Sequence, residues 1–555
     1  TTGSAVLDLN GDGLPDIARN ESGSPADIRE VALNTGTQFS PYSIDHGFPY
    51  RVDDQPGEGF RPSGTDFVDI NGDGFIDQVF HNEDATGATT LSGVYLNQAS
   101  LRDVLTHVTN GFGVTAEIVY APLNERDAQG NALIYEKGSG TSGELMDMTG
   151  SMYVVEEVKH EDGAGGQYSM EYRYGGLRTH RLRGSAGFEW VSTLDTRTDI
   201  VSTTTFAQEF PFTGMPVDSF TQTEGGAGVT LSETTTIYDR KPLNDGKTWL
   251  VFAKSSSTTT RDLDGSIVAE TSTITQRGAL GQTDDYDEYG NSLHIEADLD
   301  DGYSKVTINT YDNTVSADKW HLGRLTRSEV ASIGPNDPAP GLERVSEFTY
   351  DSGTGLLKTE TIEPDFESTG TPEQRRTWMR TTYGYDDFGN KETVTIEAAG
   401  YDPQTDTFDA PVSRATTTQF DAFGRLPEWA ENALGHRQTF LEYFQGLGIA
   451  KSVKGPNELV THFEIDGFGR VTKETRPDTT ISEVRRRWVS GNAPAGALYY
   501  IETTATGAAP TVEFFDAFGR SIRKLGVDGD GFAVAADTAY DAMGRAASTS
   551  TSFRT

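Results

Sequence analysis

A short turn motif recurs through the second half of the chain and limits the folds that this half can adopt. Each copy places a large apolar residue, usually aromatic, before an aspartate, and a glycine three residues after that aspartate. The full copies lie at 286–291, 385–390, 420–425, 465–470, 515–520 and 540–545, and Tyr350-Asp351-Ser352-Gly353 is a variant. Aspartate can accept hydrogen bonds within its own turn, and glycine supplies a positive φ. The motif predicts a series of β-hairpin turns, with paired aromatic residues packing between successive hairpins.

The spacing of the motif is irregular. Intervals of 35, 35, 45, 50 and 25 residues separate the aspartates at positions 351, 386, 421, 466, 516 and 541, so we expect insertions between the units. One hairpin is not stable alone, but stacked hairpins pair strand to strand and share apolar surface. Between the turns, β-branched and polar residues alternate, as in 270–275, 305–311 and 392–396. This alternation is typical of half-buried strands, and the sequence predicts an all-β chain.

Two acidic loops near the N-terminus form a second repeat. Both read Asp-x-Asn-x-Asp-Gly-x-x-Asp, at 8–16 and 69–77. Oxygen atoms at positions 1, 3, 5 and 9, with a main-chain carbonyl at position 7, can surround one Ca²⁺, which takes about six to eight oxygen ligands. The predicted ligands are Asp8, Asn10, Asp12, Leu14 and Asp16 in the first loop and Asp69, Asn71, Asp73, Phe75 and Asp77 in the second, Leu14 and Phe75 through their carbonyls.

The alternative for these loops is an ordinary Asp/Asn/Gly turn without a metal. Neither loop matches an EF-hand, because no glutamate follows at position 12 and no helical pattern flanks it. Residues 1–100 hold 16 acidic and 4 basic residues, and this local acidity favours cation binding. A shorter run, Asp528-Gly529-Asp530-Gly531, lacks the remaining ligands and is interpreted as a plain hairpin turn.

Composition narrows the functional classes. A length of 555 residues predicts about two to four domains or a repeat array. The net charge of −39 argues against nucleic acids and anionic membranes as partners. The absence of cysteine excludes disulfides, thiolate metal sites and cysteine nucleophiles. No stretch approaches the roughly 18 apolar residues of a membrane span.

No catalytic motif stands out, so the chain is not predicted to be an enzyme. The G-x-G-x-x-G match at 138–143 has no adequate helix after it and is interpreted as a loop. His160-Glu161 is an isolated pair on a predicted hairpin, and a sugar-processing enzyme has little support, because carboxylate pairs carry little information among 84 acidic residues. Three consecutive arginines at 485–487, beside Trp488, are compatible with a nucleic-acid-binding patch. Alternate residues of a strand point to opposite faces, however, so pairing of these arginines with acidic residues on neighbouring strands is favoured.

The two repeats and the residues between them resemble known families. The acidic loops resemble the FG-GAP/VCBS repeats of calcium-binding β-propellers, and the aromatic-Asp-x-x-Gly units resemble the RHS or YD repeat. The segments 110–115, 152–155, 172–174, 187–190, 210–214 and 320–325 look like the middle region of the B component of Tc insecticidal toxins. The order of propeller, middle region and repeats is also that of this component.

The resemblance implies a division into propeller blades at 1–100, a β-rich middle region at 101–270 and an RHS sheet at 271–555 that spirals into part of a hollow shell. The family's SpvB-like region, most of its propeller, its self-cleaving core and its variable toxin have no counterpart here, so self-cleavage and toxicity are not assigned. Both ends of the sequence cut through predicted strands, and we expect a slice of a longer protein.

The resemblance also implies a function. The chain would be a structural shell component of a secreted or extracellular toxin that encloses a passenger from the same or a partner chain. The propeller would bind Ca²⁺ and serve for docking or gating, with a Tc-A-like translocation channel as a partner. From about residue 270 the sheet is expected to curve around a cavity with a partly polar inner wall. The alternative is an extracellular adhesion module of the teneurin or wall-associated type.

Overall fold

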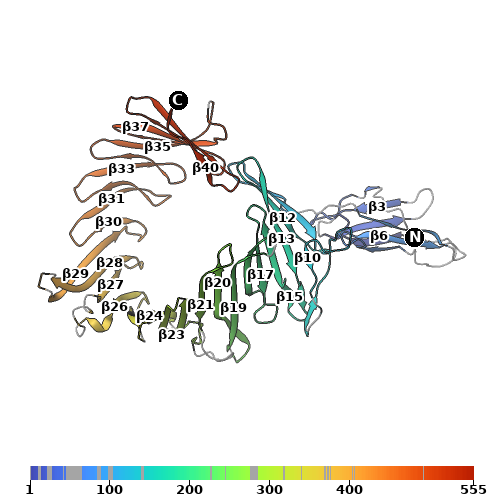
Figure 1. Cartoon of the computed structure of the whole chain (residues 1–555), viewed down its shortest axis with the longest axis horizontal. Coiled ribbons are helices and arrows are strands. Elements are labelled where there is room, and N and C mark those ends of the chain that lie inside the picture. Colours follow the sequence, from blue (N-terminus) through green and yellow to red (C-terminus); the bar gives the residue numbers. More distant parts are fainter. Residues whose placement is uncertain are drawn as a thin grey trace. The chain divides into compact units, whose positions relative to one another are not determined.

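The computed structural model describes residues 2–10, 14–21, 28–41, 43–44, 65–83, 89–97, 104–138, 140, 143–225, 228–243, 245–275, 285–299, 301–316, 319–338, 341–367, 371, 374, 377–402, 404–405, 407–491 and 493–555. By their contacts the residues form two units, described separately below: unit 1 is Thr1–Pro216 with Thr221–Gly228, and unit 2 is Val217–Phe220 with Val229–Thr555. Strands dominate both units (Figure 1), as the alternating sequence predicts. Among the described residues, no helix has the length and apolar character needed to cross a membrane.

Unit 1 contains two small N-terminal sheets, a larger and mainly antiparallel sheet, and a third small sheet. The small sheets have the orders β1-β2-β3-β4 and β5-β6-β7, and the third small sheet has the order β11-β14-β15. In the larger sheet β8 pairs with β9, β9 with β12, β12 with β13, β13 with β16 and β16 with β17, while β10 runs parallel to β13. The strands are β1 (Thr2–Leu7), β2 (Asp16–Glu21), β3 (Ile28–Ala32), β4 (Ser43–Ile44), β5 (Thr65–Val68), β6 (Asp77–Glu83), β7 (Thr89–Tyr95), β8 (His107–Thr109), β9 (Thr115–Pro122), β10 (Tyr135–Glu136), β11 (Leu145–Asp147), β12 (Tyr153–Glu161), β13 (Gln167–Gly175), β14 (Arg178–His180), β15 (Gly184–Gly187), β16 (Trp190–Asp195), β17 (Ile200–Phe206) and, across the unit boundary, β18 (Pro216–Thr223).

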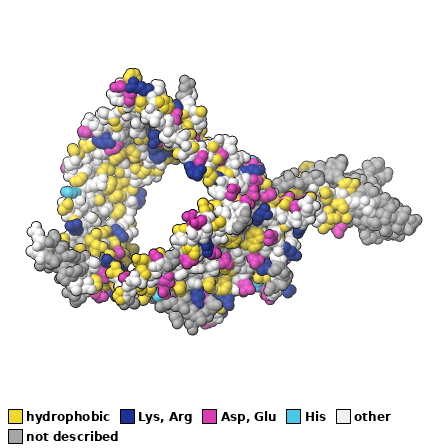
Figure 2. Space-filling model, in the orientation of Figure 1, with side chains coloured by type: hydrophobic (Ala, Val, Ile, Leu, Met, Phe, Trp, Pro, Cys, Tyr) yellow, Lys and Arg dark blue, Asp and Glu magenta, His cyan; other side chains and the backbone are white. Residues whose placement is uncertain are grey.

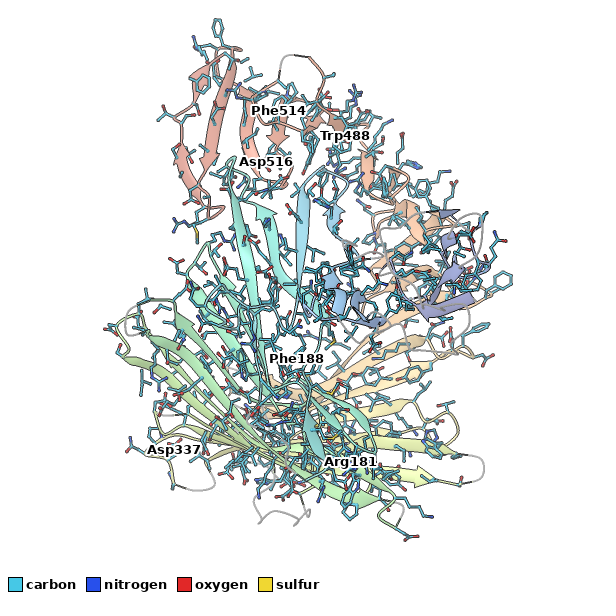
Figure 3. All side chains as sticks on the ribbon, turned by 90° about the vertical axis from the view of Figure 1, so that its right-hand side faces the viewer. Arg181, Phe188, Asp337, Trp488, Phe514 and Asp516 are labelled. Carbon is cyan, nitrogen blue, oxygen red and sulfur yellow. The ribbon has the colours of Figure 1, made fainter. Side chains whose placement is uncertain are left out.

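A compact apolar core lies in the larger sheet of unit 1. Its buried members are Ala121, Leu123, Ile134, Tyr135 and Leu177. Phe188 packs against this cluster (Figure 3), with its ring centroid 4.8 Å from that of Tyr174 and 6.3 Å from that of Tyr135. Burial raises the pKa of Tyr174 to about 12, and its hydroxyl donates to the Val155 carbonyl. The core therefore joins β9, β10, β12 and β13 through apolar contacts.

Unit 2 is a long meander. Every strand from β19 to β39 pairs antiparallel with the next, and β39 also pairs with β40 and β41. A 3₁₀ turn, η1 (Pro364–Phe366), lies between β26 and β27. The strands are β19 (Thr230–Leu243), β20 (Thr248–Arg261), β21 (Ile267–Ile274), β22 (His294–Leu299), β23 (Ser304–Val315), β24 (Trp320–Ile333), β25 (Leu342–Tyr350), β26 (Leu357–Ile362), β27 (Met379–Tyr385), β28 (Lys391–Asp402), β29 (Thr407–Phe420), β30 (Pro427–Glu431), β31 (Arg437–Phe444), β32 (Ile449–Lys454), β33 (Val460–Ile465), β34 (Val471–Thr475), β35 (Ile481–Trp488), β36 (Tyr499–Ala505), β37 (Ala508–Phe515), β38 (Ser521–Val527), β39 (Ala533–Tyr540), β40 (Ala546–Thr549) and β41 (Phe553–Arg554).

All motif turns lie on one edge of this meander, which we call the motif edge. Because strand direction alternates, every connection from an odd-numbered strand to the next even-numbered one falls on the same edge. The motif turns join β21 to β22, β25 to β26, β27 to β28, β29 to β30, β33 to β34, β37 to β38 and β39 to β40. The intervals of 45 and 50 residues each contain one additional hairpin, β31–β32 and β35–β36, that lacks the motif. At these two places the predicted insertions are whole hairpins.

The described part of unit 2 has little packed interior. Its buried apolar residues are only Phe252, Tyr286, Trp378 and Ala535. The strands from β19 to β40 instead follow one another around an arc (Figure 1), and hydrophobic side chains gather on its concave side (Figure 2). The predicted all-β curved sheet is confirmed. The concave side is more apolar than the partly polar wall expected from the sequence.

Each motif aspartate closes its turn through its side chain. Asp386 Oδ1 accepts the amides of Phe388 and Asn390 at 2.9 and 2.8 Å, and Oδ2 accepts Asn390 Nδ2 at 2.9 Å. Where arginine replaces asparagine, as at Arg470, Nε bonds the second oxygen of Asp466 at 2.7 Å. All six motif glycines have positive φ, between 66° and 92°, as predicted. The residue after the glycine therefore completes the turn, which explains why it is asparagine or arginine.

The first ring of the motif is joined to the preceding hairpin. In β25, β27, β29, β33, β37 and β39 the register shifts directly before the first motif residue, because the facing strand carries one extra residue there as a β-bulge. The Tyr385 hydroxyl donates to the Leu357 carbonyl at 2.7 Å, and Leu357 is the residue that pairs with Tyr350 in the hairpin before. We call this hydrogen bond the latch, and it recurs in the motif from Tyr350 to Leu325 and from Tyr540 to Ser521. The hairpin β31–β32, which lacks the motif, forms the same bond from Tyr443 to Pro427.

The second ring behaves differently from the prediction. Phe423 and Phe468 are 67% and 86% exposed, so the expectation that both rings pack between units is wrong for these two second rings. The Phe388 ring is 63% exposed but lies against Gly424 of the next motif turn. Arg425 and Arg470 place their guanidinium groups over the rings of Phe423 and Phe468, at 4.6 and 5.2 Å from the centroids. The same two arginines also pair with the aspartates of their own turns, Asp421 and Asp466. The rings of Phe423 and Phe468 therefore pack on an arginine of their own turn.

Replacing two motif glycines by alanine separates backbone strain from steric contact. Both Gly424 and Gly544 have positive φ, but a Cβ at 424 would lie 2.4 Å from the Phe388 ring, whereas a Cβ at 544 meets nothing within 4 Å. Gly544→Ala should lower the free energy of unfolding by about 1 kcal/mol, and Gly424→Ala by roughly 1–2 kcal/mol more. Urea denaturation of the full chain measures both, and equal losses would show that Phe388 imposes no constraint.

The latch predicts opposite effects for a matched pair of tyrosine and phenylalanine changes. Tyr385→Phe removes one hydrogen bond to the Leu357 carbonyl and should destabilise the chain by about 1 kcal/mol. Phe420→Tyr places a hydroxyl at the equivalent position beside the Lys391 carbonyl, because Lys391 pairs with Tyr385. It should leave stability unchanged or raise it by up to about 1 kcal/mol. A loss from Phe420→Tyr as large as that from Tyr385→Phe would contradict the latch.

Candidate functional site

The acidic loops occupy equivalent places in two small sheets. Loop 8–16 joins β1 to β2, and loop 69–77 joins β5 to β6. Asp12 lies outside the described residues, as do residues 11 and 13, so the second loop gives the fuller view. Gly72 and Gly74 give that loop two residues with positive φ, which the sharp turn requires.

The last aspartate of loop 69–77 ties the loop to its own sheet. Asp77 is fully buried, and its Oδ2 accepts the Ile70 amide at 3.0 Å while Oδ1 accepts the Asn97 amide at 2.8 Å. The Asn97 side chain donates in turn to the carbonyls of Ile76 at 3.2 Å and Leu9 at 2.9 Å. Through Asn97 the second loop is therefore joined to the first.

The first loop repeats this arrangement. Buried Asp16 accepts the Leu9 amide at 2.9 Å and the Asn34 amide at 2.8 Å, and Asn34 Nδ2 lies 3.2 Å from the Pro15 carbonyl. The sequence analysis missed Asn34 and Asn97. Their signal is a Leu-Asn dipeptide after a strand in each repeat, at 33–34 and 96–97.

The other side chains of loop 69–77 bond the amides of the loop. Asp69 accepts Gly72 N at 2.6 Å and Gly74 N at 2.9 Å, one with each carboxylate oxygen. Asn71 Oδ1 accepts the Asp73 amide at 3.0 Å, and Asn71 Nδ2 donates to Asp73 Oδ2 at 2.7 Å. Across the ranges that the structure describes, no three acidic or histidine side chains converge as a metal-binding group. The predicted metal ligands of this loop therefore lie in one turn, but their side chains do not point to one common centre.

The chemistry of the loop nevertheless suits a hard cation. Asp69 and Asp73 form no ion pair with a described residue. The predicted ligand atoms at positions 1, 3 and 5 of the loop are oxygens, which a hard cation prefers. Burial, followed by the carboxylates of Asp73, Asp69 and Glu125, raises the pKa of Tyr153 beside the loop. The Asn124 side chain lies next to Gly72 with Nδ2 as its nearest atom, and its buried Oδ1 has no hydrogen-bond partner among the described residues. Asp69, Asn71 and Asp73, with the Phe75 carbonyl, are therefore the residues that would hold Ca²⁺, and a cation would take the place of the amide donors.

The remaining sequence candidates form ordinary structure. The 528–532 turn is a plain hairpin turn as predicted, with Asp528 accepting the amides of Asp530 and Phe532. Arg485 pairs with Glu502 on the neighbouring strand β36 at 3.7 Å, which confirms the predicted pairing for this arginine, and with Glu483 on its own strand at 2.7 Å. Trp488 lies at the end of the same strand (Figure 3).

The two weaker enzyme signals also fall on strands and turns. His160 lies in the β12–β13 hairpin, stacked on Tyr168 with 5.2 Å between ring centroids. The glycine-rich stretch at 138–143, of which 139, 141 and 142 lie outside the described residues, leads into strand β11 and not into a helix. The Gly140 amide donates to Asp147, so the described part of this stretch caps a neighbouring carboxylate.

A family model matches part of the chain. Residues 54–214 match the model described as the insecticide toxin TcdB middle/N-terminal region. Among curated proteins, none matches the chain.

Solved structures of Tc toxins have a similar fold. A crystal structure of TcdB2-TccC3-TEV aligns over 100% of this chain with a TM-score of 0.58 and 11% identity, and a Photorhabdus luminescens Tc holotoxin pore carrying a TccC3 mutation aligns over 98% with a TM-score of 0.57 and 11% identity. A crystal structure of TcdB2-TccC3 aligns over 98% with a TM-score of 0.53 and 12% identity. The chain spans 40%, 39% and 38% of the lengths of these structures, respectively. The chain is thus similar to the Tc toxin B component in residues 54–214 and in its fold.

The loop predicts a calcium-dependent melting transition of the N-terminal sheets. With free Ca²⁺ at about 100 times its dissociation constant, binding to the folded form alone adds about 2.7 kcal/mol, which chelation removes. Asp73→Asn should reduce the calcium-dependent shift, whereas Asp66→Asn, on β5 outside the loop, should retain it. Calorimetry of the full chain in millimolar calcium and in chelator measures the shift, and identical transitions would mark the loops as ordinary turns.

Proposed function

We propose that this chain is a wall segment of a secreted Tc-like toxin complex. Its meander of RHS/YD-type repeats would enclose and shield a toxic passenger, and its N-terminal sheets would belong to an FG-GAP/VCBS propeller that binds Ca²⁺ and serves for docking or gating. The observation that carries this proposal is the meander of unit 2, in which successive hairpins pair with their neighbours and bury few side chains. A sheet of this kind is suited to form a wall, because it gains stability from neighbouring strands and needs no central core.

The concave side of unit 2 supports the passenger part of the proposal. An apolar surface of this extent on one side of a sheet calls for a covering partner. Hydrophobic side chains gather there (Figure 2), and an unfolded polypeptide exposes apolar side chains that such a surface can contact. Electrostatic attraction adds little, because residues 415–555 hold 17 acidic and 15 basic residues.

The partners of the similar structures suggest partners for this chain. Those structures contain TccC3 with TcdB2 or describe a Tc holotoxin pore. We infer a passenger chain of the TccC3 kind on the repeat sheet and a Tc-A-like channel at the propeller. A complex of this kind acts outside the producing cell, so we infer a secreted location. Nothing in these roles requires catalysis by this chain.

Enclosure predicts protection of the passenger from proteases. The full chain should be co-expressed with its candidate passenger and digested with proteinase K. The passenger should survive at least about tenfold longer in the co-expressed complex than when the two chains are purified separately and mixed, since a closed wall excludes the protease. Equal digestion rates would end the enclosure proposal and leave the extracellular adhesion module as the better account.

A further inference from the structure

The loop 69–77 is covered by the start of strand β12. The Tyr153 hydroxyl donates to the main-chain carbonyl of Asp73 at 2.6 Å. Its ring lies 6.2 Å from that of Phe75, measured between centroids. A Cβ on Gly74 would lie 3.0 Å from the Tyr153 ring and 3.2 Å from the Ser151 carbonyl. Main chain and side chain of the larger sheet therefore touch the turn directly.

A second contact comes from the end of strand β9. A Cβ on Gly72 would lie 2.0 Å from Asn124 Nδ2 and 3.7 Å from Asn124 Oδ1. That Oδ1 is buried and has no hydrogen-bond partner among the described residues. A buried amide oxygen without a partner is unfavourable, so a cation or a hydrogen-bond donor close to it would stabilise it.

We propose that loop 69–77 is a cation-dependent clamp between the β5–β6 hairpin and the larger sheet of unit 1. A cation held by Asp69, Asn71 and Asp73 would fix the turn, Tyr153 would hold the fixed turn through the Asp73 carbonyl, and Asn124 Oδ1 would face it as a further oxygen. This inference rests on the calcium binding proposed above.

The coupling follows from the loop's own bonding. Without a cation, Asp69 and Asp73 accept the amides of Gly72, Gly74 and Phe75, all within the loop. A cation draws these carboxylates to one centre and restricts the main chain between them.

That restriction reaches the larger sheet at two linked points. Tyr153 at the start of β12 contacts the loop through the Asp73 carbonyl, and Asn124, just after the end of β9, contacts it at Gly72. The Leu123 amide donates to the Met152 carbonyl at 3.0 Å, so the two points are themselves joined. A cation that restricts the main chain of the loop should therefore also restrict the main chain at the start of β12 and at the end of β9.

Hydrogen exchange of the full chain, in millimolar calcium and in chelator, tests the clamp. Calcium should slow exchange at least about fivefold in 69–77 and also in 122–125 and 151–155. In Tyr153→Phe the gain at 151–155 should be lost while the gain at 69–77 persists. Tyr172→Phe is the matched control, because the Tyr172 hydroxyl on β13 makes no hydrogen bond with a described residue, and this variant should behave as the wild type.

Calorimetric titration with calcium tests the Asn124 contact. Asn124→Asp should tighten binding about tenfold, because affinity rises with the charge of the ligands. Gln129→Glu adds the same charge at an exposed turn position and should leave affinity unchanged. Unchanged affinity in Asn124→Asp would remove Asn124 from the clamp.

The outcomes separate the clamp from calcium binding. A wild-type chain that binds no calcium overturns both. A chain that binds calcium but gains protection only in 69–77, with no effect of Tyr153→Phe, overturns the clamp and leaves calcium binding in place.

Discussion

The structure depends on aspartate side chains that accept the main-chain amides of their own turns. At Asp541 the amide and the guanidinium of Arg545 lower the pKa of the carboxyl, and at Asp421 the Arg425 amide does the same. Each turn is thereby specified by local sequence. Since the described residues of unit 2 include few buried side chains, locally specified turns and pairing between neighbouring strands supply most of its order.

The acidic loops use the same interaction in another setting. Asp77 is a buried carboxylate whose two oxygens accept amides from two separate segments, and Asp16 repeats it. Position 9 of each loop therefore has a structural role whether or not a metal binds. Calcium at positions 1, 3 and 5 would add to a frame that Asp77 and Asn97 already hold together.

The sequence predicted the features that are encoded within a few residues. The all-β class, the hairpin turns at Asp386 and its equivalents and the positive φ of Gly424 all follow from local chemistry. The latch from Tyr385 to Leu357 could not be predicted, because it depends on which hairpin lies alongside and on a bulge in that hairpin. The exposure of Phe468 was missed for the same reason, since a ring at a turn can face either the neighbouring unit or solvent. Calcium ligation by Asp69, Asn71 and Asp73 stays a prediction.

A density map of the intact complex tests the central claim most directly, namely that the repeats form a wall without a packed core. We expect a single layer of β-sheet around a hollow interior, with weak or irregular density for the passenger against the concave side. A second sheet packed about 10 Å from the concave side, in the manner of a β-sandwich, would contradict the account. It would show that the apolar band is half of an ordinary hydrophobic core.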